Sequence, residues 1–98
     1  MLKTAIEEIF LYHEFHRPDG NGWLATGETI SGAVVTVSDK QTGADTTATM
    51  VAQAAPFNDT QVIYKAKGGS LGKSYRYRIV ATTSNGQIFE DSVEVKII

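Results

Sequence analysis

The chain has 98 residues, a length that fits one domain and leaves little room for a second core. Hydrophobic residues make up 42% and charged residues 20% of the sequence, which excludes an extensively disordered chain, and the net charge of −2 argues against a nucleic-acid-binding protein. The absence of cysteine excludes disulfides, thiolate metal sites and cysteine nucleophiles, and it fits synthesis in a reducing cytoplasm.

Residues 1–12 carry two overlapping hydrophobic patterns. A helical stripe would use Leu2, Ile6, Ile9, Phe10 and His13. Strand alternation would use Ile9, Leu11, His13 and Phe15. We favour a short N-terminal helix or arm over residues 1–12 that runs into a strand. Glu7 and Glu8 interrupt the apolar stretch that a signal peptide needs, so we expect no export signal, and no apolar run approaches the ~18 residues of a membrane span.

The stretch HEFH, residues 13–16, contains both histidines of the chain. His13 and His16 are three residues apart, which places them on one face of a helix but on opposite faces of a strand. The pattern also differs from H-E-x-x-H, in which histidines four apart on a helix hold zinc. Pro18 soon ends regular structure, and only Glu14 or Asp19 is near enough to be a third ligand. We therefore predict a solvated strand end and no metal site.

A loop and a bulged strand are predicted next. RPDGNG, residues 17–22, combines residue types that favour turns, and we expect Trp23 to fill the core after it. In the following strand Ala33, Val35 and Val37 share one face, whereas Ile30 lies one position out of phase. A bulge near residues 31–32 would restore the phase.

Two turns and two strands follow in the middle of the chain. We predict turns in DKQTGADT, residues 39–46, and in APFND, residues 55–59. Between them TTATMVAQA is predicted to be a weak strand in which Met50 points inward. TQVIYKAK, residues 60–67, is predicted to be a half-buried strand with Val62, Tyr64 and Ala66 on its buried side.

The last third predicts a β-hairpin, because two alternating segments are joined by Asn85-Gly86, a dipeptide that accepts positive φ. The buried positions of its first strand are Tyr75, Tyr77, Ile79 and Ala81. Those of its second strand are Phe89, Val93, Val95 and Ile97. Six to seven short strands with almost no helix predict an all-β, antiparallel β-sandwich formed by residues 1–98 as a single domain.

No arrangement of polar residues predicts catalysis. The chain has no G-x-S-x-G motif, and on a strand Glu90 and Glu94 point outward, away from any cleft. GGSLGK, residues 68–73, resembles a phosphate-binding loop, but only three residues separate Gly68 from Gly72 and a strand follows, so we expect a turn. We expect no enzyme activity, no catalytic residues and no cofactor.

One group of basic residues is a candidate docking surface for an acidic partner. Its members are Lys65, Lys67, Lys73, Arg76 and Arg78, and no acidic residue lies between positions 60 and 89. The alternative is that outward Lys and Arg side chains keep strand edges from pairing indiscriminately.

GGSLGKSYRYRIVATTSNGQ, residues 68–87, resembles the last strand pair of immunoglobulin-like and fibronectin type III-like sandwiches. In those folds a tyrosine early in the penultimate strand forms a hydrogen bond from its hydroxyl to the backbone of the preceding corner. Tyr75 occupies the matching position. Together with the hydrophobic pattern, this predicts structural roles for Trp23, Ile30, Tyr75, Tyr77 and Gly86.

A narrower resemblance covers roughly three quarters of the chain. FHRPDGNGWLATGETIS and, after some thirty residues, KGGSLGKSYRYRIVATTSNGQIFEDSVEVKI are similar to small phage and prophage virion structural proteins. That family shows F-x-x-W-L-x-x-G-[DE]-T-I, G-G-x-x-G-x-x-Y, T-[ST]-x-G-[RQ] and S-x-x-[IV]-x-V. The matching residues here are Trp23, Leu24, Gly27, Glu28, Thr29, Ile30, Gly68, Gly69, Gly72, Tyr75, Thr83, Ser84, Gly86, Gln87, Ser92, Val93 and Val95. Departures are a longer loop before Trp23, small residues after Ile30, and Gln87 where arginine is common.

The resemblance implies a protein of the virion, made in the bacterial cytoplasm and attached at the head, tail or fibre region. It implies other phage structural proteins as partners, without nucleic acid or membrane, and no catalysis. A stand-alone adhesive module that binds carbohydrate or a surface protein is the alternative, which an exposed row of aromatic residues would favour. A small metal-dependent enzyme would depend on HEFH and scattered carboxylates alone.

Overall fold

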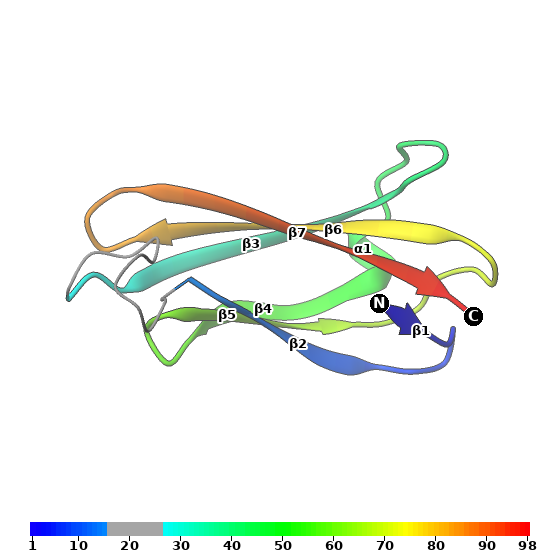
Figure 1. Ribbon diagram of the computed structural model, residues 1–98, viewed down its shortest axis with the longest axis horizontal. Coiled ribbons are helices and arrows are strands. Elements are labelled where there is room, and N and C mark those ends of the chain that lie inside the picture. Colours follow the sequence, from blue (N-terminus) through cyan, green and yellow to red (C-terminus); the bar gives the residue numbers. More distant parts are fainter. Residues whose placement is uncertain (16–26) are drawn as a thin grey trace.

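The structure is a computed structural model that describes residues 1–15 and 27–98, and the described residues form two facing β-sheets (Figure 1). One sheet has the strand order β1-β7-β6-β3 and the other has the order β2-β5-β4. The elements are β1 (Leu2–Lys3), β2 (Ile9–Glu14), β3 (Ile30–Asp39), α1 (Thr47–Met50), β4 (Val51–Phe57), β5 (Gln61–Ala66), β6 (Ser74–Thr83) and β7 (Ile88–Ile97). The predicted all-β class is confirmed. The prediction that every strand is antiparallel is wrong, because β1 pairs with β7 in parallel.

The N-terminal segment forms strands, so the helix predicted as one alternative for residues 1–12 is wrong. Ile9 and Leu11 lie toward the other sheet and Phe10 and Tyr12 lie outward, as strand alternation requires. The first three residues instead bind β7, where the Lys96 N–H donates to the carbonyl of Met1 at 2.9 Å. These cross-strand hydrogen bonds stabilise the segment as a strand, whereas an isolated helix of this length is only marginally stable.

Lys3 fixes β1 at this end of the molecule. Its side chain is completely buried, and its Nζ donates to the carbonyls of Thr4 and Gly68, both at 2.7 Å. Burial lowers the pKa of Lys3 below its ordinary value, while the nearby Glu7 and Glu8 oppose that shift. The charge-assisted hydrogen bond to Gly68 therefore joins the N-terminal strand to the loop that precedes β6.

The bulge predicted in β3 is present. Ile30 pairs with Thr83, but the next pair is Gly32 with Thr82, so β3 contains one residue more than its partner at this point. The extra residue restores the phase, and Ile30, Val35 and Val37 are all buried. Local apolar spacing alone was sufficient to locate this irregularity.

The segment after β3 differs from its prediction. Thr47–Met50 is a short helix, and β4 continues through Pro56 and Phe57, where we expected a turn. Asp45 favours the helical turn, because its Oδ1 accepts hydrogen bonds from the Thr47 N–H at 2.9 Å and the Thr47 hydroxyl at 2.6 Å. Proline is tolerated in β4 because β4 is an edge strand. Met50 is buried, as predicted.

The last two strands have the predicted pairing and faces. Tyr75, Tyr77, Ile79 and Ala81 are buried, and the loop between β6 and β7 contains Asn85-Gly86, with φ of 81° at Gly86. Tyr77 donates its hydroxyl hydrogen to the carbonyl of Met50 at 2.8 Å, which links β6 to the end of α1 through the core. The predicted core position of Trp23 lies outside the described residues.

Candidate interaction surfaces

His13 joins the two sheets instead of ending in solvent. Its Nδ1 lies 3.2 Å from Asp91 Oδ2 on β7, and its Nε2 lies 3.0 Å from the Tyr64 hydroxyl on β5. The His13 side chain is only 11% exposed. The solvated strand end predicted from HEFH is therefore wrong for His13, because odd-numbered residues of β2 face inward. His16 lies outside the described residues.

Asp91, His13 and Tyr64 form a hydrogen-bonded series that resembles a catalytic relay, but the hydroxyl at its end, on Tyr64, is inaccessible. Tyr64 has no exposed surface, and burial raises the pKa of its hydroxyl well above the ordinary range, helped by the proximity of Tyr77 and Asp91. The Tyr64 ring stacks on Tyr77 with 5.5 Å between centroids. The described residues contain no group of three His, Cys, Asp or Glu side chains that could hold a metal ion. This chain of contacts connects the sheets.

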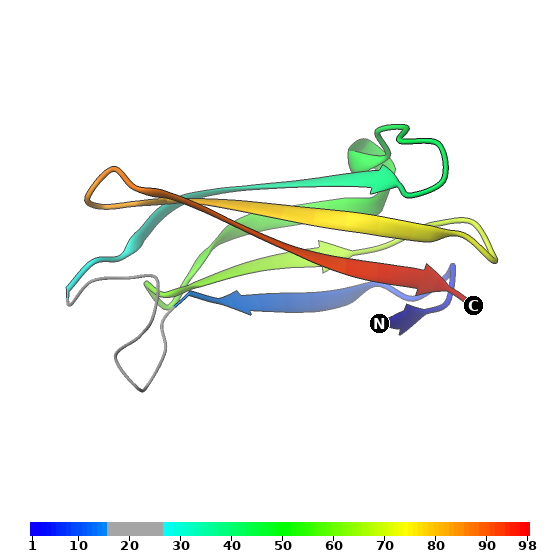
Figure 2. The ribbon, with the colours of Figure 1, turned by 45° about the horizontal axis from the view of Figure 1, so that its top comes forward.

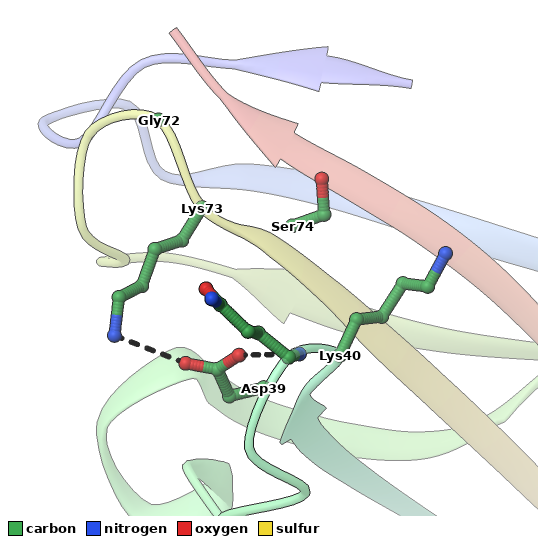
Figure 3. A pocket seen from close by; sticks show the side chains of 6 residues that line it. Asp39, Lys40, Gly72, Lys73 and Ser74 are labelled. Carbon is green, nitrogen blue, oxygen red and sulfur yellow. Dashed lines mark hydrogen bonds and ion pairs between the residues drawn. The ribbon is translucent and has the colours of Figure 1, made fainter.

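A pocket at the C-terminal end of β3 is lined by Asp39 and by the turn that precedes β6 (Figure 3). Asp39 Oδ1 accepts the N–H of Gln41 at 2.8 Å, and Oδ2 accepts from Lys73 Nζ at 3.1 Å. The Gln41 hydrogen bond and then the Lys73 side chain hold the pKa of Asp39 below its ordinary value. A carboxylate held ionised by internal donors is a poor general base, and it serves here to close the turn after β3.

The structure does not gather the five predicted basic residues into one positive face. Lys65 lies on the outer face of the three-stranded sheet, whereas Arg76 and Arg78 lie on the outer face of the four-stranded sheet. Lys67 follows the end of β5, and Lys73 is in the turn before β6.

Four of these basic side chains contact carboxylates from distant parts of the sequence. Lys65 lies 3.1 Å from Glu8 and Lys73 lies 3.1 Å from Asp39. The remaining two contacts join Arg76 to Glu94 at 3.4 Å and Arg78 to Glu90 at 3.1 Å. Sequence reasoning missed these partners because the acids are adjacent only through strand pairing. The two arginine pairs are exposed and contribute little to stability, whereas the Lys73 pair involves the buried carboxylate of Asp39.

The outer face of the three-stranded sheet carries an exposed group that sequence reasoning also missed. Phe10 is 48% exposed and Tyr12 is 53% exposed, and strand pairing places them opposite Lys65 and Ile63. Lys65 Nζ lies 5.8 Å from the centre of the Phe10 ring, within cation–π range. We call Phe10, Tyr12, Ile63 and Lys65 the aromatic face. The signal for it was the alternation of β2, whose even-numbered residues must point away from the core.

Two motifs noted in the sequence meet at the end of the sandwich where β3 begins and β6 ends. The Thr29 N–H donates to Ser84 Oγ at 3.1 Å, and the Ser84 N–H donates to the Thr29 carbonyl at 2.8 Å. Beside them the Thr83 hydroxyl donates to the buried carboxylate of Glu28 at 2.5 Å. The residues GETI and TSNGQ therefore form one structural clamp that joins the start of β3 to the β6–β7 loop.

Comparison with known protein families identifies the group to which this chain belongs. A family model described as the podophage GP4 fiber-tail adaptor protein gp77 matches residues 15–96. The chain belongs to this adaptor family. The resemblance to phage virion structural proteins noted in the sequence is thereby confirmed. No curated protein and no solved structure matches the chain.

The match to the adaptor family includes both clamp motifs and the strands β3 to β7, but it begins after β2. Phe10 and Tyr12 on the aromatic face therefore precede the matched region. The family description names a fibre–tail adaptor, and the chain is accordingly a phage structural protein. In the described part of the chain, no helix is long and apolar enough to cross a membrane.

Proposed function

We propose that this chain is a non-enzymatic structural adaptor that docks to other proteins of the virion near the fibre–tail junction. The observation that carries the proposal is the family match over residues 15–96. The side-chain chemistry supports it, because the carboxylates of Asp39 and Asp91 and the ring of His13 are engaged in bonds within the fold.

We further propose that residues 1–98 form a single immunoglobulin-like domain. Strand pairing supports this, since β2-β5-β4 and β7-β6-β3 reproduce the B-E-D and G-F-C orders of that fold. Tyr75 provides a second argument. It lies at the start of β6, and its hydroxyl oxygen accepts the Ser70 N–H at 3.0 Å, a bond back to the corner that precedes the strand.

The aromatic face is the docking surface that we propose for this adaptor. Exposed aromatic rings beside a cation contribute strongly to protein interfaces, because they bury a large area at a low cost in side-chain entropy. Lys65 belongs to this face. Lys67, Lys73, Arg76 and Arg78 are proposed as secondary docking contacts. The exposed ion pairs of Arg76 and Arg78 are weak and can be exchanged for carboxylates of a partner.

Particles provide the test. The phage is propagated with the wild-type chain or with Phe10→Ser/Tyr12→Ser, and virions are purified on a density gradient and quantified by mass spectrometry. Val34→Ser/Leu71→Ser is the matched control, because it removes two exposed apolar side chains that lie outside the aromatic face. We expect stoichiometric incorporation of the wild type and the control, and loss of the aromatic-face variant. A wild-type chain left entirely in the soluble fraction would refute the adaptor function.

An adhesive module is the second candidate, and the exposed Phe10 and Tyr12 side chains favour it. Aromatic rings on an exposed sheet surface can stack on sugars. A glycan array probed with the purified chain distinguishes the two functions. Binding of a defined glycan that Phe10→Ser abolishes would support the adhesive function, whereas an adaptor gives no glycan signal.

A further inference from the structure

β7 has an edge that the rest of the described chain covers only at one end. β1 pairs with β7 through two residues, opposite Lys96 and Ile97, and Figure 2 shows β1 beside the C-terminal end of β7 alone. On its other side β7 pairs with β6 continuously from Ile88 to Lys96. Within residues 1–15 and 27–98, no strand pairs with the remaining length of this edge.

The backbone groups on this edge can be assigned from the contacts at its covered end. The N–H groups of Lys96 and Ile98 donate toward β1, and the carbonyl of Glu94 accepts from the N-terminal amine of Met1 at 3.2 Å. Hydrogen-bonding direction alternates along a strand, so the even-numbered residues of β7 point their backbone groups away from β6. Glu90 and Ser92 therefore present donors and acceptors to the open edge, and both residues are exposed.

Asp91 is an inward-pointing charge on this edge strand. It faces the other sheet, but its side chain is 44% exposed because β7 is the last long strand of its sheet. One carboxylate oxygen approaches His13, and the other accepts the Ser92 N–H at 2.8 Å. Inward-pointing charges of this kind discourage pairing with arbitrary strands. A carbonyl of an incoming strand must replace Asp91 as the acceptor of the Ser92 N–H. One carboxylate oxygen of Asp91 then becomes available to a new donor.

Charge decides which strand fits. Along its ten residues β7 carries Glu90, Asp91 and Glu94 but only one basic residue, Lys96. In a pair of two β7 edges running antiparallel about Ser92, Glu90 would lie opposite Glu94, and pairing about Asp91 would place it opposite its own copy. Like charges directly opposite each other are destabilising, so a second copy is disfavoured. A lysine or arginine beside Asp91 would instead satisfy the released carboxylate.

We propose that the open edge of β7, from Ile88 to Glu94, binds an extended segment of another virion protein, with a lysine or arginine of that segment placed against Asp91. The inference rests on the proposed adaptor function and specifies its partner. Backbone bonds to Glu90 and Ser92 provide affinity, as in other cases of strand addition, and Asp91 provides selectivity.

The test uses overlapping 12-residue peptides that cover the fibre and tail proteins of the same phage, titrated into the ¹⁵N-labelled full chain. We expect a peptide with a basic residue to bind and to shift the amide signals of Glu90, Ser92 and Glu94. Ser92→Pro removes one edge N–H while leaving the β6 ladder intact, and it should weaken binding at least about tenfold. Ser92→Ala is the matched control, because it keeps the N–H and should retain wild-type affinity.

A second variant keeps the inference testable if Ser92→Pro does not fold. Asp91→Asn should weaken a basic peptide about fivefold at low salt, and replacing the basic residue of that peptide by glutamine should remove the difference. No peptide binding at millimolar concentration, shifts confined to Phe10 and Tyr12, or a dimer broken by Ser92→Pro would each overturn the inference. Virions that contain Ser92→Pro at full copy number would refute the edge and leave the adaptor function standing.

Discussion

The contact between His13 and Tyr64 gives a sharp test of how the two sheets are held together. The two side chains are 3.0 Å apart, and Tyr64 is fully buried, so among the described residues its hydroxyl depends on the His13 ring nitrogen. His13→Leu removes the partner and leaves a buried hydroxyl without one. That loss costs about 1–3 kcal/mol, and we expect about 2 kcal/mol of unfolding free energy because Leu still fills most of the space.

Tyr64→Phe removes the other half of the contact and should cost about 1 kcal/mol or slightly more. In the double variant both polar groups are absent and the site becomes apolar. The double variant should therefore be more stable than the sum of the single effects predicts, by about 1–2 kcal/mol. Asp91 retains contact with water in either variant, since its side chain is 44% exposed.

Urea unfolding at neutral pH, followed by tryptophan fluorescence and circular dichroism, measures this coupling. With a slope of about 1 kcal/mol per molar, a 2 kcal/mol loss shifts the midpoint by about 2 M. Single-variant losses that add to within about 0.3 kcal/mol in the double variant would refute the contact, because independent sites behave that way. The slopes of all four proteins must agree for the comparison to hold.

Three further predictions concern side chains and glycines that pack in or against the turns. Gly69→Ala should destabilise the fold by about 2–4 kcal/mol, since Gly69 has φ of 102° and an added Cβ would lie 2.6 Å from Ile97 Cγ1. Gly72→Ala is the control, because Gly72 has φ of 82° but open space around it, and it should cost only about 1 kcal/mol. Equal shifts of the melting temperature in the two variants would contradict this difference. Tyr75→Phe should lose about 1 kcal/mol by removing the corner hydrogen bond, and a urea midpoint unchanged from wild type would argue against a stabilising corner. Asp39 has a lowered pKa in the folded state, so its contribution is present above the unfolded value of 3.8 and is lost as pH falls through the folded value. The stability difference between wild type and Asp39→Asn should therefore shrink on acidification, and a gap that stays constant from neutral to acidic pH would disprove the assignment.

Several elements of the fold were predictable because their causes are local. A half-buried strand must alternate, and Val62, Tyr64 and Ala66 do so on β5 just as the odd-numbered residues do on β6. The phase error between Ile30 and Val35 could be corrected only by an inserted residue, and the bulge lies where the sequence placed it. The position of the last hairpin followed from Asn85-Gly86 for a similar reason, since few other dipeptides accept positive φ.

The candidate surfaces were less predictable, because they depend on which strands become neighbours. The basic residues between positions 60 and 89 looked unopposed in sequence, yet Arg76 lies opposite Glu94 once β6 pairs with β7. His13 looked like a strand end until the second sheet placed Asp91 and Tyr64 on either side of its ring. Residues 1–12 fitted two periods equally well, and pairing with β7 and β5 decided between them.

Residue types and their spacing were enough to predict an all-β chain, the positions of its last three strands, the buried faces of those strands and the relation to phage structural proteins. Those properties follow from residue type and spacing along a short stretch of chain. The partners of the charged side chains, the inward position of His13, the exposed aromatic face and the open edge of β7 became visible only in the folded chain. Each of these depends on contacts between segments far apart in sequence, and the free energy of such contacts is not encoded in any local pattern.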